Sequence, residues 1–529
     1  MRLPSMKYTS RIVKSKQINF GGLAHYKGAQ DGELWDMRNL TSDYYPLLAS
    51  RQPRAMLQKL DAPGGLFCWG KLCWVDGTGF YYDGVKKGTV TAGQKRFAAM
   101  GAYIIILPDK KWYNIDTGGF GSIESTWSGT ELTFTSGTGG SGNVVLKDKV
   151  DWRRYFNVGD TVSISGCTSA PGNNKSLTIR AIDGARLIFG DDSFTIAGSD
   201  VSYTENGALQ IQRRMPSVNF LWESENRLWG CTDNTVYACK PGDIFNWYTY
   251  DGLASDAWAV DTGSAGTFTG CIAYAGYPIF FKENNIYKVY GSQPSDFDLL
   301  GSATLGLAEG CAGSLAVAGE TLFYLNRNGV MAYSGGVPQP ISEAFGVEKF
   351  TDAVAGSDGL KYYISMKGSD GWGLYVYDTQ KGLWCREDDL QVTHFARYDG
   401  ALYMLDAEGY IWGTGYAQIP KGAAMEGPVE WSAEFADNTA DSPNQKGFCK
   451  LQIRLELEAG ATCQAWIQYD SDGVWHKVRH PMGEGTKRSY YLPVVPRRSD
   501  HYRLKLTGTG ECRIYSLSRA YYVGSELKY

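Results

Sequence analysis

The sequence lacks the patterns that would place it among membrane or helical proteins. Its longest strongly apolar run, AYIIILP at residues 102–108, is far shorter than the ~20 residues that span a bilayer. Stretches with a 3.6-residue apolar period are scarce, which argues against a helical fold. The opening residues, MRLPSMKYTSRIVKSK, carry positive charge without an apolar core. We therefore expect no signal peptide, no membrane-spanning segment, and synthesis in the cytoplasm of the producing cell.

Paired cysteine and histidine motifs are also missing. The eleven cysteines include no CxxC pair and stand mostly in apolar segments, so we expect reduced, buried thiols rather than disulfides or a zinc site. Only five histidines occur, and no HExxH motif. His476 and His480 are four apart, but in an expected strand, where this spacing does not bring them together. We predict no metal site and no cofactor.

No arrangement of catalytic residues stands out. GTGGSG at 137–142 matches GxGxxG, but the following NVVLKDK indicates a strand and not the helix that a phosphate-binding loop needs, so we interpret it as a hairpin loop. YDSDG at 469–473 lacks the later ligands of a calcium loop and is expected to be a turn. Paired acids for glycoside hydrolysis stay possible, because their separation is not visible in sequence. We expect no enzyme and name no catalytic residue.

Charge is unevenly distributed along the chain. The net charge of −4 comprises +6 in residues 1–60 and +2 in 428–529, which leaves −12 for 61–427. Tight DNA binding needs clustered Lys and Arg opposite the phosphates, so the acidic middle argues against it.

Aromatic residues and glycine are abundant. Aromatics make up 14% of the chain, and there are 65 glycines among 529 residues. Aromatics favour strands and glycine favours tight turns, so the composition predicts an all-β fold.

Seven segments share one design: a Gly or polar corner, a short apolar strand, a polar turn and a second aromatic strand. This is the pattern of a β-hairpin, and after residue 215 the copies recur about every 40–50 residues, the spacing of propeller blades. Blade strands can be apolar on both faces because neighbouring blades cover both. The segments are residues 67–84, 100–118, 225–239, 274–291, 317–336, 358–379 and 398–415.

The hairpins predict a β-propeller of about seven blades, from residues 61–128 and 215–427; two separate sandwiches are the alternative. Residues 129–214 alternate apolar and polar side chains with period two, which predicts a small inserted β-barrel. Residues 428–529 contain longer alternating strands and predict a C-terminal β-sandwich. We assign residues 1–60 to an N-terminal arm and docking segment.

Several segments resemble a family of phage proteins. INFGGL…DGELWDMRNLTSDYYPLLASRQPR (18–54) is similar to the start of certain tailed-bacteriophage structural proteins. ENRLWGC…KPGDIFNWYTYDG, GYPIFFKENNIYKVYG and SLAVAGETLFYLNRNGVMAYSGG resemble the propeller of tail nozzle proteins, also called packaged-DNA stabilisation or tail tubular proteins. An inserted barrel also fits that family, whereas residues 428–529 match it less well.

The resemblance implies a virion component that forms a six-fold ring below the portal-connector and conducts DNA through its lumen. An acidic or neutral wall suits a conduit, because it does not retain the phosphates. We expect other copies, the connector or adaptor and further tail proteins as partners, with only transient, non-specific passage of DNA. The arm's basic residues are candidates for docking on acidic neighbours; they are Lys14, Lys16, Arg38, Arg51 and Arg54.

Two other functions stay open. A receptor- or glycan-binding tail protein is the main alternative, with Trp466, Trp475 and Tyr491 of the C-terminal sandwich as candidates for stacking on sugar rings. A propeller glycoside hydrolase or lyase is the third hypothesis.

Overall fold

The structure is a computed structural model. It describes residues 12–26, 30–135, 144–190, 193–195, 202–414, 424–439, 445–478, 482, 485–494 and 497–523. The GTGGSG segment and His480 lie outside these residues. The chain divides into two compact units, residues 62–312 and residues 1–61 with 313–529, and each is described by itself.

The described residues form β-sheets joined by turns and four short 3-10 helices. Seven of the sheets are four-stranded antiparallel meanders, the form of propeller blades. The predicted fold class is confirmed: an all-β chain with about seven blades, a small inserted β-domain and a C-terminal sandwich.

Four blades belong to the unit of residues 62–312. Each follows chain order, and their strands are β6 (Pro63–Trp69), β7 (Lys71–Asp76), β8 (Gly79–Tyr82) and β9 (Val85–Thr89); β10 (Arg96–Met100), β11 (Tyr103–Leu107), β12 (Lys111–Asn114) and β13 (Phe120–Ser122); β21 (Phe220–Ser224), β22 (Arg227–Thr232), β23 (Thr235–Ala238) and β24 (Trp258–Asp261); and β25 (Gly270–Tyr274), β26 (Tyr277–Lys282), β27 (Asn285–Tyr290) and β28 (Asp298–Ala303).

Three blades belong to the other unit. Their strands are β29 (Ala316–Ala318), β30 (Thr321–Asn326), β31 (Gly329–Tyr333) and β32 (Gln339–Pro340); β33 (Ala353–Ser357), β34 (Lys361–Gly368), β35 (Gly371–Asp378) and β36 (Leu383–Arg386); and β37 (Val392–Tyr398), β38 (Ala401–Asp406), β39 (Tyr410–Gly413) and β5 (Ala55–Lys59).

The last of these blades is completed by a strand from the start of the chain. β5 pairs with β39, with Lys59 opposite Tyr410 and Ala55 opposite Gly413. The sequence division placed β5 in the arm and began the propeller at residue 61. Its segment, AMLQK, is a single strand without the hairpin pattern of the other blades, so only the pairing reveals it.

The aromatic strands are explained by packing between blades. All six side chains of β38 are buried, so both faces of this strand are covered. One core joins β21–β24 to β25–β28 through Trp229 and Phe280, and another joins β33–β36 to β37–β39 through Tyr363 and Leu402. A turn between β37 and β38 at Asp399 and Gly400 has positive φ at both residues, as a two-residue type I′ hairpin requires.

The inserted domain, predicted as a barrel, is a curled sheet whose edge strands are not paired with each other. Its order is β17-β16-β20-β14-β15-β19-β18, around one core that includes Trp127, Trp152 and Phe156. Only two residues separate the edge strands β17 and β18 in the sequence, so the two edges of the sheet lie near each other. They do not form the ladder of hydrogen bonds that would close a barrel. The bounds are β14 (Ser125–Thr135), β15 (Val144–Leu146), β16 (Thr161–Ser165), β17 (Ser176–Thr178), β18 (Ala181–Asp183), β19 (Arg186–Ile188) and β20 (Ser202–Arg213).

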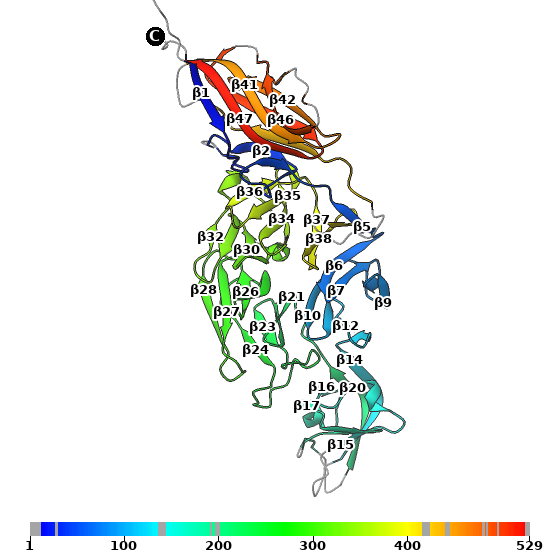
Figure 1. The fold of residues 1–529 in the computed structure, drawn as a ribbon. Helices are drawn as coiled ribbons and strands as arrows, with labels where there is room; N and C mark the ends of the chain where they lie inside the picture. Colours follow the sequence, from blue (N-terminus) through cyan, green and yellow to red (C-terminus); the bar gives the residue numbers. More distant parts are fainter. Residues whose placement is uncertain are drawn as a thin grey trace, which may run out of the picture. The chain divides into compact units, whose positions relative to one another are not determined.

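The C-terminal sandwich consists of two sheets, and Figure 1 shows the first strands of the chain lying within it. Sheet A contains β1 (Ile12–Gln17), β3 (Leu40–Thr41), β4 (Leu48–Ser50), β41 (Lys446–Leu457), β44 (Gly485–Leu492), β45 (Arg498–Ser499) and β47 (Cys512–Val523). Sheet B has the order β2 (Leu34–Arg38), β40 (Glu430–Phe435), β46 (Tyr502–Thr509), β42 (Thr462–Tyr469) and β43 (His476–Lys477).

The described part of the N-terminal segment is therefore not a free arm. β1 pairs with β47 and β2 with β40. Asp31 accepts two hydrogen bonds from the buried Arg519, at 2.6 and 2.7 Å. Apolar side chains such as Leu34, Met37 and Leu40 are fully buried, and this burial holds the segment on the sandwich.

Candidate functional site

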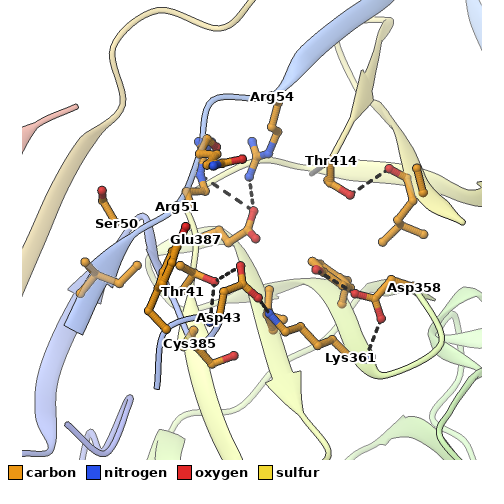
Figure 2. A pocket seen from close by; sticks show the side chains of 18 of the residues that line it. Thr41, Asp43, Ser50, Arg51, Arg54, Asp358, Lys361, Cys385, Glu387 and Thr414 are labelled. Carbon is orange, nitrogen blue, oxygen red and sulfur yellow. Dashed lines mark hydrogen bonds and ion pairs between the residues drawn. The ribbon is translucent and has the colours of Figure 1, made fainter. Parts of the chain in front are cut away.

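A cavity of about 400 Å³ lies in the unit that contains the sandwich. It is enclosed by the segment around β3 and β4 on one side and by the blades β33–β36 and β37–β39 on the other. Figure 2 shows Lys361 directed at Asp43, and Arg51 and Arg54 directed at Glu387. The cavity thus lies beneath the segment that the sequence predicted to dock on other proteins.

One side of the cavity is closed by a short loop held by ion pairs. Asp43 contacts the ammonium of Lys361 and accepts a 2.7 Å hydrogen bond from the Thr41 hydroxyl. The hydroxyl of Ser42 donates to Asp378 at 2.6 Å. Burial opposes the charge on both Asp43 and Lys361, but their mutual hydrogen bond and attraction outweigh it. The pKa of Asp43 is therefore lowered and the pKa of Lys361 is raised.

The opposite side is an ion cluster of two arginines and three carboxylates. Arg54 donates to Asp388 at 2.7 Å and to Glu387 at 2.5 Å. Arg51 donates to both oxygens of Glu426, at 2.6 and 2.7 Å, and to Asp388 at 3.3 Å. The side chains of Arg51 and Arg54 are only 6% and 4% exposed, so their charges are internal to this unit.

Ion pairing favours the charged forms of Arg54, Asp388 and Glu426. Burial lowers the pKa of Arg54, but Glu387 and Asp388 more than offset it, so its pKa is raised. Burial also opposes ionisation of Asp388 and Glu426; the guanidinium groups nevertheless hold both carboxyl pKa values below their usual range. Arg54, Asp388 and Glu426 are thus charged near neutral pH.

Two side chains that line the cavity, Cys385 and Tyr363, could act as nucleophiles only if they lost their protons. Burial raises the pKa of the Cys385 thiol to about 12. Burial, followed by the charges of Glu387 and Asp358, raises the pKa of Tyr363 well above its ordinary value. Both groups stay protonated near neutral pH, so neither is an activated nucleophile.

The five predicted docking residues are separated into two groups. Lys14 and Lys16 are exposed on β1, and the half-exposed Arg38 lies 3.0 Å from Asp389. Arg51 and Arg54 belong to the buried cluster and do not reach the surface. Sequence reasoning missed their partners, although the acidic run Glu387–Asp388–Asp389 in CREDDLQ is a visible signal for them.

The candidate sugar-stacking residues lie on two different sheets. Trp466 on β42 and Trp475 before β43 belong to sheet B, whereas Tyr491, 56% exposed, lies on β44 of sheet A. Both tryptophans adjoin Lys505, which is opposite Trp466 in the ladder and 5.5 Å from the ring centroid of Trp475, whereas Tyr491 lies apart from them.

A third tryptophan joins the same sheet. Trp35 on β2, which sequence reasoning did not select, has the guanidinium of Arg503 4.9 Å from its ring centroid. The ammonium of Lys505 is 5.5 Å from the centroid of Trp475, and that of Lys477 is 5.6 Å from Trp466. We call these six residues the tryptophan–cation face; they are Trp35, Trp466, Trp475, Lys477, Arg503 and Lys505.

The described residues contain neither a candidate metal-binding cluster nor a helix that could span a membrane. No group of three or more His, Cys, Asp or Glu side chains there could hold a metal ion. Within the same ranges, no helix is long and apolar enough to cross a bilayer.

Comparisons with known proteins give only distant structural likenesses. No protein-family model and no curated protein matches the chain. BamB from Moraxella catarrhalis is 11% identical, over 70% of this chain and 99% of its own, with a TM-score of 0.34. Trypanosoma rangeli sialidase is 9% identical over 92% and 94%, at 0.21, and an exo-beta-1,3-galactanase from Phanerochaete chrysosporium is 8% identical over 57% and 95%, at 0.22. Likenesses this weak carry no functional argument.

Proposed function

We propose that this chain is a structural protein of a bacteriophage tail. In this proposal several copies, about six, form a closed ring below the portal-connector. The ring retains the packaged genome and conducts DNA during ejection. Its partners are further copies, the connector or adaptor and other tail proteins, and its location is the virion tail after synthesis in the host cytoplasm. DNA passes without specific binding, and no cofactor or catalytic residue takes part.

The main structural support is the way in which the start of the chain is fixed. The N-terminal segment supplies strands to the sandwich and one strand to the last blade, and the buried Arg51–Arg54 cluster fastens it between them. Breaking a buried ion pair typically costs about 3–5 kcal/mol, so this segment resists local detachment. A tail component under the pressure of packaged DNA needs such mechanical continuity within each subunit.

Two sequence features agree with this role. The resemblance to tail nozzle proteins implies that the chain forms a ring and that it binds the connector. The net charge of −12 in residues 61–427 disfavours retention of DNA, because few cations are available to neutralise phosphates. Lys14, Lys16 and Arg38 remain proposed docking residues, since they are on the surface, whereas Arg51 and Arg54 have internal partners.

The test is the copy number on the connector. Purified chain is mixed with the connector of the same particle, and the assembly is weighed by native mass spectrometry. We expect about six copies per connector. A strictly monomeric or trimeric chain in assembled particles would overturn the nozzle proposal. In the same assay, Lys14→Glu weakens assembly, and Arg488→Glu, at an exposed position of sheet A, is the matched charge control.

The second candidate function is binding of a receptor glycan by the sandwich. The observation that favours it is that Trp466 on β42 and Trp475, directly before β43, adjoin the same lysine and are both only half-buried. Aromatic rings exposed on a rigid sheet offer contact area at a low entropic cost. It predicts saturable binding of the chain to host surface glycan that is lost in Trp475→Ala. Equal binding of the glycan by this variant and by the unmodified chain would exclude sheet B as the glycan-binding site.

A further inference from the structure

Alternation along the strands defines the outer face of sheet B. On β42, Cys463, Ala465 and Ile467 are buried, whereas Trp466 points to the opposite side. On β46, Leu504 and Leu506 are buried, and Arg503 and Lys505 alternate with them. Because successive side chains in a strand point to opposite faces, the tryptophans and cations share the face that is turned away from the core.

The ladder places the two lysines on either side of Trp466. In the antiparallel pairing, Trp466 is opposite Lys505 of β46 and opposite Lys477 of β43. The indole N–H of Trp466 donates to the Thr507 hydroxyl at 3.1 Å, which fixes the direction of the ring across the neighbouring strand. The ring is thus held in place before any ligand arrives, which reduces the ordering cost of binding.

Trp475 and Trp35 extend the same face. Trp475 comes from the turn before β43 and reaches Lys505, and Trp35 on β2 meets Arg503. Sheet B has five strands, and with neighbouring strands ~4.8 Å apart the face is roughly 20 Å across. Three rings with three cations over this width make an extended face rather than a pocket for one small molecule.

Acidic neighbours limit the positive charge of the face. Arg503 pairs with Glu434 at 3.2 Å and with Asp437 at 2.6 Å, and Lys505 lies 3.6 Å from Glu434. The exposed Lys477 has no carboxylate partner among the ion pairs of the described residues. The face therefore has a small excess of positive charge, available mainly at Lys477.

This balance selects the class of ligand. Single-stranded nucleic acid carries a phosphate on every nucleotide and is bound where cations follow the whole strand. Here Glu434 and Asp437 interrupt the cations and would repel successive phosphates. A neutral sugar would leave Lys477 without a partner. A polymer of sugar rings with scattered carboxylates matches both the rings and the few free cations.

We propose that the tryptophan–cation face binds an acidic polysaccharide that contains uronate residues. Sugar rings stack on Trp466 and Trp475, and a carboxylate meets Lys477. The proposal rests on the second candidate function, for which it names the ligand class. It does not depend on the proposal that the chain is a tail nozzle protein. Tyr491, on the other sheet, takes no part.

The experiment measures binding of the full chain to matched probes by isothermal titration calorimetry. The probes are a hexamer of galacturonate, maltohexaose as the neutral oligomer, glycerol phosphate oligomers and a single-stranded oligothymidylate. We expect the uronate hexamer to bind most tightly. Trp475→Ala should weaken it at least about tenfold, since the variant loses one of the two rings on which sugar stacks. Lys477→Gln should weaken it about two- to fivefold, and less so at high salt.

Controls and outcomes separate this inference from the function on which it rests. Tyr491→Ala, an exposed aromatic on sheet A, should bind the hexamer like the unmodified chain, and thermal unfolding should show that all variants are folded. Equal binding of maltohexaose that is lost in Trp475→Ala would retain the glycan function and overturn the acidic class. Preference for oligothymidylate would overturn the inference in favour of nucleic acid. No binding of any sugar probe, together with unimpaired attachment of Trp475→Ala to host surface glycan, would overturn both.

Discussion

Arg51 and Glu426, 375 positions apart in the chain, form a bidentate ion pair with nitrogen–oxygen distances of 2.6 and 2.7 Å. The pair joins the residues that precede β5 to those that follow β39. Since β5 and β39 are neighbours in one sheet, the ion pair and the strand pairing fix the same junction. Planar guanidinium and carboxylate groups suit this geometry, and lysine could not replace it.

Removal of a buried arginine from this cluster is expected to destabilise the unit. Arg54→Met leaves the buried Glu387 and Asp388 with only their longer contacts to Arg51, at 3.9 and 3.3 Å, and we expect the free energy of unfolding to fall by about 3–5 kcal/mol. Urea titration followed by tryptophan fluorescence measures the change. Arg38→Ala, which removes an exposed ion pair with Asp389, should change it by less than about 1 kcal/mol. Similar effects of the two substitutions would refute the role of burial.

Stability of the inserted domain is expected to fall in acid because of Glu205. This buried carboxylate accepts hydrogen bonds from the amides of Ser169 and Ala170, both at 3.0 Å, and from the Tyr203 hydroxyl at 3.1 Å. Burial opposes its ionisation, but these bonds prevail and lower its pKa from 4.5 to about 2. A folded-state pKa below the unfolded value means that the stabilisation is complete above pH 4.5 and is lost as the pH falls toward 2.

Glu205→Gln tests this assignment. Hydrogen bonds to a charged acceptor contribute about 1.5–3 kcal/mol, so the variant should be less stable at pH 7 by about 2 kcal/mol. Its stability should also depend less on pH between 4.5 and 2. Thermal unfolding across that range gives both quantities. An unchanged acid profile in the variant would assign the pH dependence to other carboxylates.

Close packing of neighbouring blades is expected to make Gly356 intolerant of a side chain. A Cβ atom on Gly356 of β33 would lie 2.4 Å from the Cβ of Phe395 on β37. Gly356→Ala therefore forces the two blades apart, and we expect a loss of about 1–3 kcal/mol by chemical denaturation. Gly427→Ala, where nothing lies within 4 Å, is the control and should be close to neutral. A neutral Gly356→Ala would show that the two strands are not closely packed.

Pairing of β5 can be tested by two truncations. A chain that starts at residue 51 keeps β5, whereas a chain that starts at residue 62 lacks it. Only the second should lose amide-exchange protection in β39, because its edge then has no partner strand. Hydrogen exchange monitored by mass spectrometry compares the two. If β39 loses protection equally in both, the loss comes from the missing sandwich strands and not from β5.

Sequence alone was sufficient for the hairpins and for the all-β fold class with about seven blades. In segments such as residues 398–415, apolar strands and their turn are close together, so the pattern is local and readable. Reduced cysteines were equally predictable, and all eleven are free thiols. The sequence predicted a closed barrel for the insertion, and the structure shows an open one. Closure depends on whether β17 and β18 pair, and both are only three residues long.

Only the tertiary structure decided where residues 12–26 and 30–60 lie in the fold. Lys14 and Arg54 are both basic residues of the same segment. Lys14 is exposed on β1, whereas Arg54 is buried beside Glu387 and Asp388, more than 300 positions away. The tryptophan–cation face likewise joins Trp35 to residues near the end of the chain. Burial and ion pairing depend on which distant segments meet, and no local pattern records that. The sequence by itself determined the strands; long-range pairing determined which of their charges and rings are available for binding.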